Sequence, residues 1–104
     1  MLICFPAQAE TVKATWYGKQ FHGRKTANGE RFDQYSFTAA HRYFKFGTVL
    51  HLTHKDKHVI VRINDRGPFK RGISIDMSYA AAKKLGCIDI GICKVKMTIL
   101  SKGN

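Results

Sequence analysis

An alternating apolar stretch that ends in a rigid polar turn limits the fold of this chain more than any other segment. Residues 59–63 carry branched apolar side chains at every second position, a period typical of a strand with one buried face. Asp65 and Arg66 follow, and Gly67-Pro68 then forces a turn, because proline fixes φ and glycine accepts unusual dihedrals. Asp65 is therefore either presented to a ligand or only hydrogen-bonded to its own turn.

The remaining pattern predicts a small barrel. Further strands are predicted at residues 11–17, 48–53, 73–75 and 92–100, and one helix at residues 79–85. Ser78 is a suitable N-cap for this helix, and Gly86 ends it. Five or six short strands with one helix predict a mainly β fold, a small six-stranded barrel, because closure removes exposed strand edges. A Rossmann plan is excluded, since no glycine-rich phosphate loop follows a strand.

Length and charge narrow the classes of partner. The 104 residues fit one small domain, and the formal charge of +11 favours anionic partners such as an acidic polymer, acidic lipid or nucleic acid. A nucleic-acid-binding barrel is disfavoured, because the aromatic residues lie mainly in predicted loops rather than among basic residues on one sheet face. No apolar run approaches the roughly 20 residues of a membrane span. We expect a monomer that binds no nucleic acid.

The N-terminal residues predict export. Ala7-Gln8-Ala9 matches the small-x-small pattern of a signal-peptidase site, so residues 1–9 are interpreted as the remnant of a signal peptide. Residues 10–104 then form the domain, in the periplasm or elsewhere in the cell envelope. No lipid anchor is expected at Cys4, because the residue before it is not small.

The other two cysteines allow two interpretations. An exported protein could pair Cys87 with Cys93. Cys93 also shares an alternating face with Val95 and Met97, where a buried free thiol would lie, and the sequence favours this thiol.

A histidine-rich hairpin is the other feature that could suggest a metal. His51, His54 and His58 surround a predicted turn, and strand alternation favours a solvated hairpin tip over a metal site. No Cys and His spacing resembles a zinc site, so neither a metal nor another cofactor is expected.

Two further polar residues are candidates for a site. Glu30 directly follows the turn signal Asn28-Gly29, and His41 is the histidine flanked by small residues, which leaves room for a ligand. Each has a plainer alternative. Glu30 is also consistent with a solvated ion pair, and His41 with a structural histidine.

Several stretches taken together resemble the rare lipoprotein A (RlpA) family of bacterial proteins. The matching stretches are TWYG at 15–18, FHGRKTANGERFD at 21–33, TAAHR at 38–42, FGT at 46–48, VRINDRGPF at 61–69, IDMS at 75–78 and AAA at 80–82. The resemblance implies a double-psi β-barrel, and a periplasmic or outer-membrane-associated lytic transglycosylase. Its expected partner is peptidoglycan, with a preference for glycan strands that lack stem peptides.

The same resemblance implies roles for three residues. Asp65 and His41 would be catalytic, with Asp65 serving first as the acid that protonates the leaving oxygen and then as the base. Partial burial would have to raise the pKa of Asp65 for this task. His41 would bind substrate or orient Asp65, and Glu30 would contact substrate or support the site.

Aromatic and basic side chains complete the expected substrate site. Trp16, Tyr17 and Phe69 would offer stacking platforms for sugar rings. Arg66 is expected to point outward or to bind substrate, because its charge would otherwise oppose a protonated Asp65. The alternative function is a non-catalytic module of expansin type that binds or loosens cell-wall glycan through the same cleft.

Overall fold

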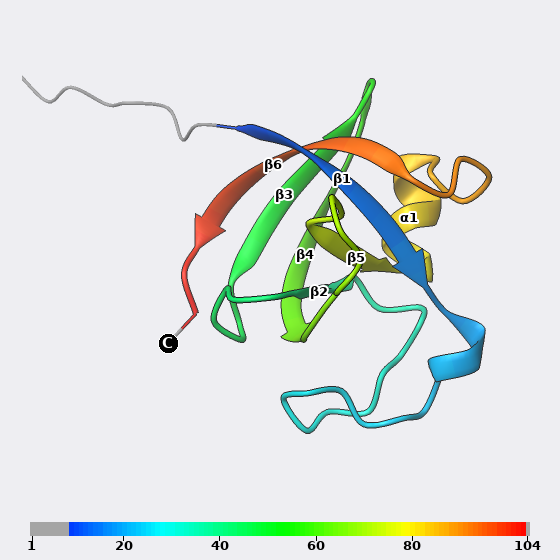
Figure 1. The fold of residues 1–104 in the computed structure, drawn as a ribbon, viewed down its shortest axis with the longest axis vertical. Coiled ribbons are helices and arrows are strands. Elements are labelled where there is room, and N and C mark those ends of the chain that lie inside the picture. Colours follow the sequence, from blue (N-terminus) through cyan, green and yellow to red (C-terminus); the bar gives the residue numbers. More distant parts are fainter. Residues whose placement is uncertain (1–8, 104) are drawn as a thin grey trace, which may run out of the picture.

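The computed structural model describes residues 9–103, in which six strands close into a barrel (Figure 1). In chain order the elements are β1 (Glu10–Tyr17), the 3-10 helix η1 (Lys19–Phe21), β2 (Thr38–His41), β3 (Val49–His54), β4 (Lys57–Asp65), β5 (Ile75–Ser78), α1 (Tyr79–Leu85) and β6 (Cys93–Ser101). The predicted mainly β barrel of six strands with one short helix is confirmed.

The strand order places segments from distant parts of the sequence side by side. Around the barrel the order is β1-β5-β2-β4-β3-β6, with β1–β5 and β2–β4 parallel and the other pairs antiparallel. In this arrangement β5 lies between β1 and β2. Residues of the short β5 therefore have β1 on one side and β2 on the other.

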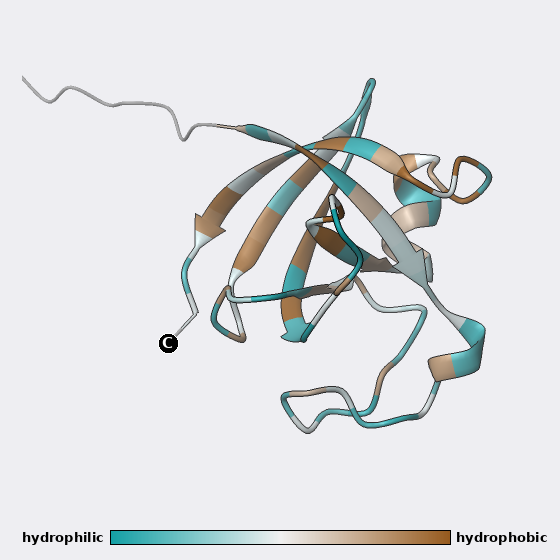
Figure 2. Cartoon of the chain, viewed as in Figure 1, coloured by the Kyte–Doolittle hydropathy of each residue, from teal (hydrophilic) through white to brown (hydrophobic). Residues whose placement is uncertain are grey.

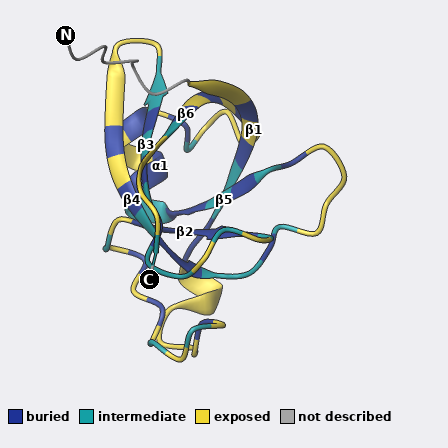
Figure 3. Ribbon diagram, turned by 90° about the vertical axis from the view of Figure 1, so that its left-hand side faces the viewer, coloured by how far each residue is buried: buried dark blue, intermediate teal, exposed yellow. Residues whose placement is uncertain are grey.

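Alternation along the strands fills the barrel. Figure 2 shows apolar and polar residues alternating along β3 and β6, as expected for strands with one buried face. Leu50, Leu52, Ile63 and Ile75 are completely buried in one apolar cluster. Burying each such side chain stabilises the fold by about 1.5 to 3 kcal/mol. In Figure 3 buried positions alternate with exposed ones along β4, whereas η1 has no buried residue.

The short helix α1 packs against the barrel with the boundaries that the sequence predicts. Ser78 Oγ accepts a hydrogen bond from the backbone N–H of Ala81, and Gly86 ends the helix with φ of 75°. The inner face of α1 is fully buried, including Leu85. Ser78 Oγ also donates to the carbonyl of Ser36, so the cap fastens the long loop between η1 and β2.

One predicted strand is displaced by two residues. The sequence predicts residues 73–75, with Asp76 at the end, but β5 runs from Ile75 to Ser78. The reason lies in the partners: β1 pairs with all four residues of β5, and β2 pairs with the first three. Asp76 is therefore inside a central strand rather than after one.

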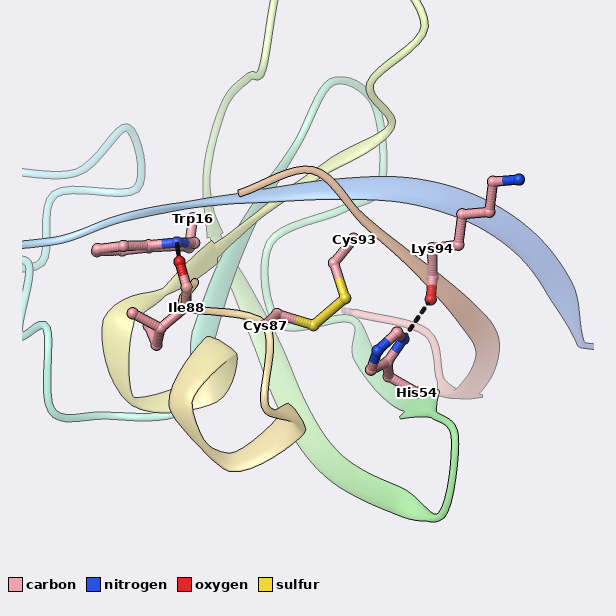
Figure 4. Close-up of a disulfide and its surroundings, with 6 residues drawn as sticks. All are labelled: Trp16, His54, Cys87, Ile88, Cys93 and Lys94. Atoms are coloured by element: carbon pink, nitrogen blue, oxygen red, sulfur yellow. Dashed lines mark hydrogen bonds between the residues drawn. A yellow bond between two sulfur atoms is a disulfide. The ribbon is translucent and has the colours of Figure 1, made fainter. Parts of the chain in front are cut away.

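The expected free thiol at Cys93 is wrong, because Cys93 forms a disulfide with Cys87 (Figure 4). Cys93 does face inward, as its alternation with Val95 indicates, but it is the first residue of β6. The chain turns back after α1 and brings the two Cα atoms to 5.8 Å, within the usual range for a disulfide. The alternation of apolar residues predicts that Cys93 is buried, but it does not distinguish a free thiol from a disulfide.

Replacing both cysteines by serine is expected to lower the free energy of unfolding by roughly 2 kcal/mol, because the bond closes a short loop in the unfolded chain. Urea denaturation with and without a reductant measures the effect. Reduction should destabilise the wild-type protein by a similar amount and leave the double variant unchanged. Equal stability of oxidised and reduced wild-type protein would show that the bond adds nothing.

None of the helices in the region 9–103 has the length and apolarity to cross a bilayer. The remnant of a signal peptide that the sequence predicts, and Cys4 within it, fall almost entirely outside the described residues.

Candidate active site

Outward-facing side chains from three neighbouring strands, together with Asp65 at the end of a fourth, meet at one place, which we call the carboxylate shelf. It consists of Thr15 and Tyr17 on β1, Asp76 on β5, Ala40 on β2 and Asp65 on β4. Ala40 pairs with Asp65 on one side and with Asp76 on the other, so one small residue lies between two carboxylates. The register shift between Ala39 and Ala40 produces this pairing.

Asp65 is held in a fixed direction by three hydrogen bonds. Its Oδ1 accepts from the backbone N–H groups of Ala27 and Arg66, each at 2.9 Å, and its Oδ2 accepts from the Tyr17 hydroxyl at 3.3 Å. The hydrogen bond from the Ala27 N–H comes from the long loop between η1 and β2. The turn therefore presents the carboxylate, and the loop and β1 orient it.

Tyr17 connects the shelf to an aromatic layer. Its ring stacks on Phe32 with centroids 4.4 Å apart, and both side chains are buried. Burial raises the pKa of Tyr17, and the charges of Asp65 and Asp76 raise it further. The hydroxyl therefore keeps its proton at every physiological pH and donates a hydrogen bond to Asp65.

Asp76 is the residue of the shelf that the sequence analysis did not select. Burial raises the pKa of Asp76 to about 6, with a smaller contribution from the charge of Asp65 and an opposing hydrogen bond from the Thr15 hydroxyl at 2.9 Å. A carboxyl group with this pKa retains a proton for part of the time near neutral pH. Alternation of Ile75, Asp76 and Met77 could have revealed its position if the strand had been placed two residues later.

Glu30 fastens the long loop to β4. Its carboxylate accepts two hydrogen bonds from Arg62, at 2.6 and 3.0 Å, and one each from Asn64 and Asn28 at 3.0 Å. The hydrogen bond from Arg62 is the main reason that the pKa of Glu30 falls to about 2. These contacts place Glu30 beside the shelf as an anchor. Its contact with substrate stays a prediction.

Replacing Glu30 by glutamine is expected to lower the free energy of unfolding by about 1 kcal/mol at pH 7, because an ion pair at a partly exposed position is replaced by neutral bonds. The lowered pKa means that this stabilisation is present above the unfolded value of 4.5 and is lost as the pH falls towards about 2. The difference between variant and wild type should therefore shrink in acid. Urea denaturation at pH 7 and in acid measures this difference. Glu10→Gln, on the exposed start of β1, is the control.

His41 faces away from the shelf. Its Nδ1 accepts hydrogen bonds from the backbone N–H groups of Tyr43 and Phe44, and its ring stacks on the Phe44 ring with centroids 3.6 Å apart. Burial lowers the pKa of His41 to about 4, and the charges of Arg42 and Arg66 contribute. The imidazole is therefore neutral at pH 7, with its proton on Nε2. Its hydrogen bonds do not reach Asp65, so a role in orienting Asp65 would have to be indirect.

Arg66 is half-buried, and its side chain is held by the turn after β2. Its guanidinium donates to the carbonyls of His41 and Phe44 and lies 3.9 Å from the centroid of the Phe46 ring. Arg66 thus holds the turn after β2 in place, and its substrate contact stays a prediction.

The three predicted aromatic platforms are separated. Phe69 follows the turn and is 82% exposed, so its ring is open to a ligand. Tyr17 belongs to the shelf. Trp16 lies on the other face of β1, where its Nε1–H donates to the Ile88 carbonyl at 3.3 Å (Figure 4). Its ring packs against Tyr79. Trp16 is therefore not beside the carboxylates.

Potential metal ligands gather at one place within residues 9–103, away from the shelf. Atoms of His54, Cys87 and Cys93 that could bind a metal lie within 4.8 Å of one another. The disulfide leaves no thiolate, which is the form of cysteine that binds metals. His54 Nδ1 donates to the Lys94 carbonyl at 2.8 Å (Figure 4), whereas His51 and His58 lie 3.3 Å apart, nitrogen to nitrogen. The three histidines therefore do not converge.

Known proteins resemble this chain at both the sequence and the structural level. A family model described as lytic transglycolase matches residues 9–97. A probable endolytic peptidoglycan transglycosylase, RlpA, of Aquifex aeolicus is 51% identical over 92 residues, which cover 86% of this chain and 41% of that protein. The endolytic peptidoglycan transglycosylase RlpA of Vibrio cholerae is 47% identical over 94 residues, which cover 88% of this chain and 36% of that protein. The chain spans about two fifths of the length of these relatives.

Solved structures show the same fold in more distant proteins. The Streptomyces papain inhibitor superposes with a TM-score of 0.74 at 22% identity, covering 94% of this chain and all (100%) of that one. An expansin of Clavibacter michiganensis superposes with a TM-score of 0.70 at 18% identity, covering 93% of this chain and 52% of that one. At such identities the likeness concerns the fold alone. The family model and the relatives at about half identity show that the chain belongs to the RlpA-like family of lytic transglycosylases, built on a double-psi β-barrel.

Proposed function

We propose that this domain is a lytic transglycosylase that cleaves the bond between N-acetylmuramic acid and N-acetylglucosamine in peptide-poor glycan strands of peptidoglycan. The observation that carries the proposal is the carboxylate shelf, where Asp65 and Asp76 flank Ala40 and burial raises the pKa of Asp76 to about 6. A carboxyl group that keeps a proton near neutral pH, with a second carboxyl group close by, is what acid and base catalysis at one glycosidic bond requires. The names of relatives at about half identity support the substrate class.

The reaction breaks one bond and forms another without water. A carboxylic acid protonates the leaving glycosidic oxygen, and the bond between that oxygen and C1 of the muramic acid breaks. The 6-hydroxyl of the same sugar then attacks C1 and loses its proton to a carboxylate, which gives a 1,6-anhydro end. Asp76 holds the proton that is donated, and Asp65 receives the hydroxyl proton. Asp76 and Asp65 thus share the roles of acid and base, both of which the family resemblance implied for Asp65 alone.

The surrounding residues keep the shelf in position. The Tyr17 hydroxyl donates a hydrogen bond to Asp65, and Glu30 fixes the loop that contributes the Ala27 N–H. The guanidinium of Arg66 donates to the carbonyls of His41 and Phe44 and so holds the turn after β2. Phe69, exposed after the Gly67-Pro68 turn, stacks on a sugar ring of the bound strand.

Peptidoglycan lies outside the cytoplasm, so this function requires export. The buried disulfide between Cys87 and Cys93 supports an oxidising compartment, where such bonds form and persist. We place the protein in the cell envelope. A monomeric state and the absence of nucleic-acid binding stay predictions from the sequence.

Purified, peptide-free glycan strands incubated with the protein in 18O-labelled water test the reaction. Mass spectrometry should detect 1,6-anhydro ends that carry no label, because no water enters the product. Labelled reducing ends would show hydrolysis instead. Co-sedimentation with sacculi and no released product would support the non-catalytic wall-binding module of expansin type.

A further inference from the structure

A large groove lies beside α1, apart from the carboxylate shelf. Its volume is about 680 Å³, within the range of sites that bind small ligands. We call it the aromatic groove. It is lined by Trp16, Lys19, Gln20, Gln34, Tyr35, Phe37, Tyr79, Ala80, Lys83 and Lys84. The proposed reaction gives this groove no role.

Aromatic rings form the walls of the groove and remain open to solvent. Trp16 packs edge-on against Tyr79 at 5.7 Å between centroids, and Tyr35 packs perpendicular to Tyr79 at 6.3 Å. Tyr35 is 67% exposed and Phe37 is 45% exposed, so both rings are accessible to a ligand. The backbone N–H of Ala80 donates to the Gln34 carbonyl at 2.8 Å and joins the two sides. The platform is therefore preformed.

All charged side chains that line the groove, as far as the structure describes it, are lysines. Lys83 Nζ lies 5.9 Å from the centroid of the Tyr79 ring, and Lys84 Nζ lies 5.3 Å from that of Phe37. Lys19 adds a third ammonium group from η1. Contacts with the ring faces hold Lys83 and Lys84 at the edge of the groove. The groove thus combines flat apolar surfaces with positive charge.

The groove and the shelf lie on different faces of one strand. Trp16 and Tyr17 are consecutive residues of β1, so their side chains point to opposite faces. Tyr17 belongs to a small cluster with Phe32 and Ala40, whereas Trp16 packs against the main core and α1. A ligand in the groove therefore does not occupy the position of the bond that is cleaved.

We propose that the aromatic groove is a second glycan-binding site, which holds a carboxylate-bearing glycan strand away from the point of cleavage. The apolar faces of the sugar rings lie against Tyr35 and Phe37, and lysines pair with the carboxylates of the muramic acid lactyl groups. Charge complementarity selects this occupant over a neutral glycan or an apolar peptide. The proposal rests on the proposed function, because that function supplies the anionic strand.

Binding and turnover of three variants test the proposal. The groove variant is Tyr35→Ala combined with Phe37→Ala, two exposed positions whose truncation leaves the core intact. The charge variant is Lys83→Gln combined with Lys84→Gln. The matched control is Ile60→Ala with Lys96→Gln, an exposed apolar residue and a lysine elsewhere on the barrel. The probes are purified peptide-free glycan strands and neutral chitin oligosaccharides.

The groove variant should bind glycan strands about 10-fold more weakly, equivalent to about 1.4 kcal/mol, and show a raised KM with unchanged kcat. The charge variant should also bind more weakly and depend less on salt concentration. The control should match the wild type. Chitin oligosaccharides should bind more weakly to the wild type than glycan strands of equal length.

Two results overturn the proposal: unchanged glycan affinity in the groove variant, or equal affinity of the wild type for neutral and carboxylate-bearing strands. Failure of the proposed function looks different. In that case neither the wild type nor any variant releases 1,6-anhydro ends. Weaker glycan binding by the groove variant would still show that the groove binds glycan.

Discussion

Replacing Asp65 by asparagine is expected to lower the release of 1,6-anhydro ends by about 100- to 10,000-fold, the usual contribution of one acid or base group. Asparagine retains the oxygen that accepts the Ala27 and Arg66 N–H bonds, so the turn should keep its shape. It cannot take a proton from the 6-hydroxyl of the substrate. The loss should therefore appear in kcat with little change in KM.

Co-sedimentation with sacculi provides the control for this variant. The Asp65→Asn protein should pellet with sacculi as well as the wild type, because the aromatic groove and the basic surface are intact. More than a tenth of the wild-type rate in this variant would mean that Asp65 is not the base.

Replacing Asp76 by asparagine should have opposite effects on activity and on stability. Activity should fall by about 100-fold or more, because the proton for the leaving oxygen is lost. The wild-type rate should decline as the pH rises through about 6, where Asp76 loses its proton. The variant should lack this dependence. A pH profile of kcat/KM for both proteins checks the prediction.

The stability of the same variant depends on pH in a direction set by the raised pKa. Folded Asp76 binds its proton up to about pH 6, whereas the unfolded group has an ordinary value of 3.8. The stabilising contribution is therefore complete below 3.8 and is lost as the pH rises through about 6. Asparagine does not ionise, so Asp76→Asn should raise the free energy of unfolding by about 1 to 3 kcal/mol at pH 8 and by little at pH 3.5.

Urea denaturation at the two pH values measures this effect, and Asp56→Asn in the exposed turn between β3 and β4 is the control. A group that is maintained at a cost to stability is typical of a functional site. If Asp76→Asn lowered the free energy of unfolding at pH 8, the ionised carboxyl group would instead be stabilising the fold.

Local sequence signals predicted most of the fold and the position of Asp65. The boundaries of α1 follow from Ser78 and Gly86, and the strand that ends at Asp65 follows from alternation at residues 59–63. These signals act between neighbours in the chain, so they can be read directly. The resemblance to the RlpA family supplied the double-psi topology of the barrel and the roles expected of Glu30 and His41.

The features that the sequence did not reveal depend on contacts between distant segments. Asp76 gains its raised pKa from its place between β1 and β2 and from Asp65, none of which is near it in the chain. The disulfide depends on the path of the chain after α1. Likewise, the different environments of Trp16 and Tyr17 depend on distant segments. Tyr79 of α1 packs against Trp16 on one face of β1, and Phe32 stacks on Tyr17 on the other.

The titration of the shelf itself tests the account most directly. Carbon-13 NMR of the side-chain carboxyl carbons can follow Asp76 in the wild-type protein and in Asp65→Asn. We predict a midpoint of about 6 in the wild type and a lower midpoint in the variant, where the neighbouring charge is gone but burial remains. A wild-type midpoint close to the ordinary value of 3.8 would contradict a shared acid and base pair at Asp65 and Asp76.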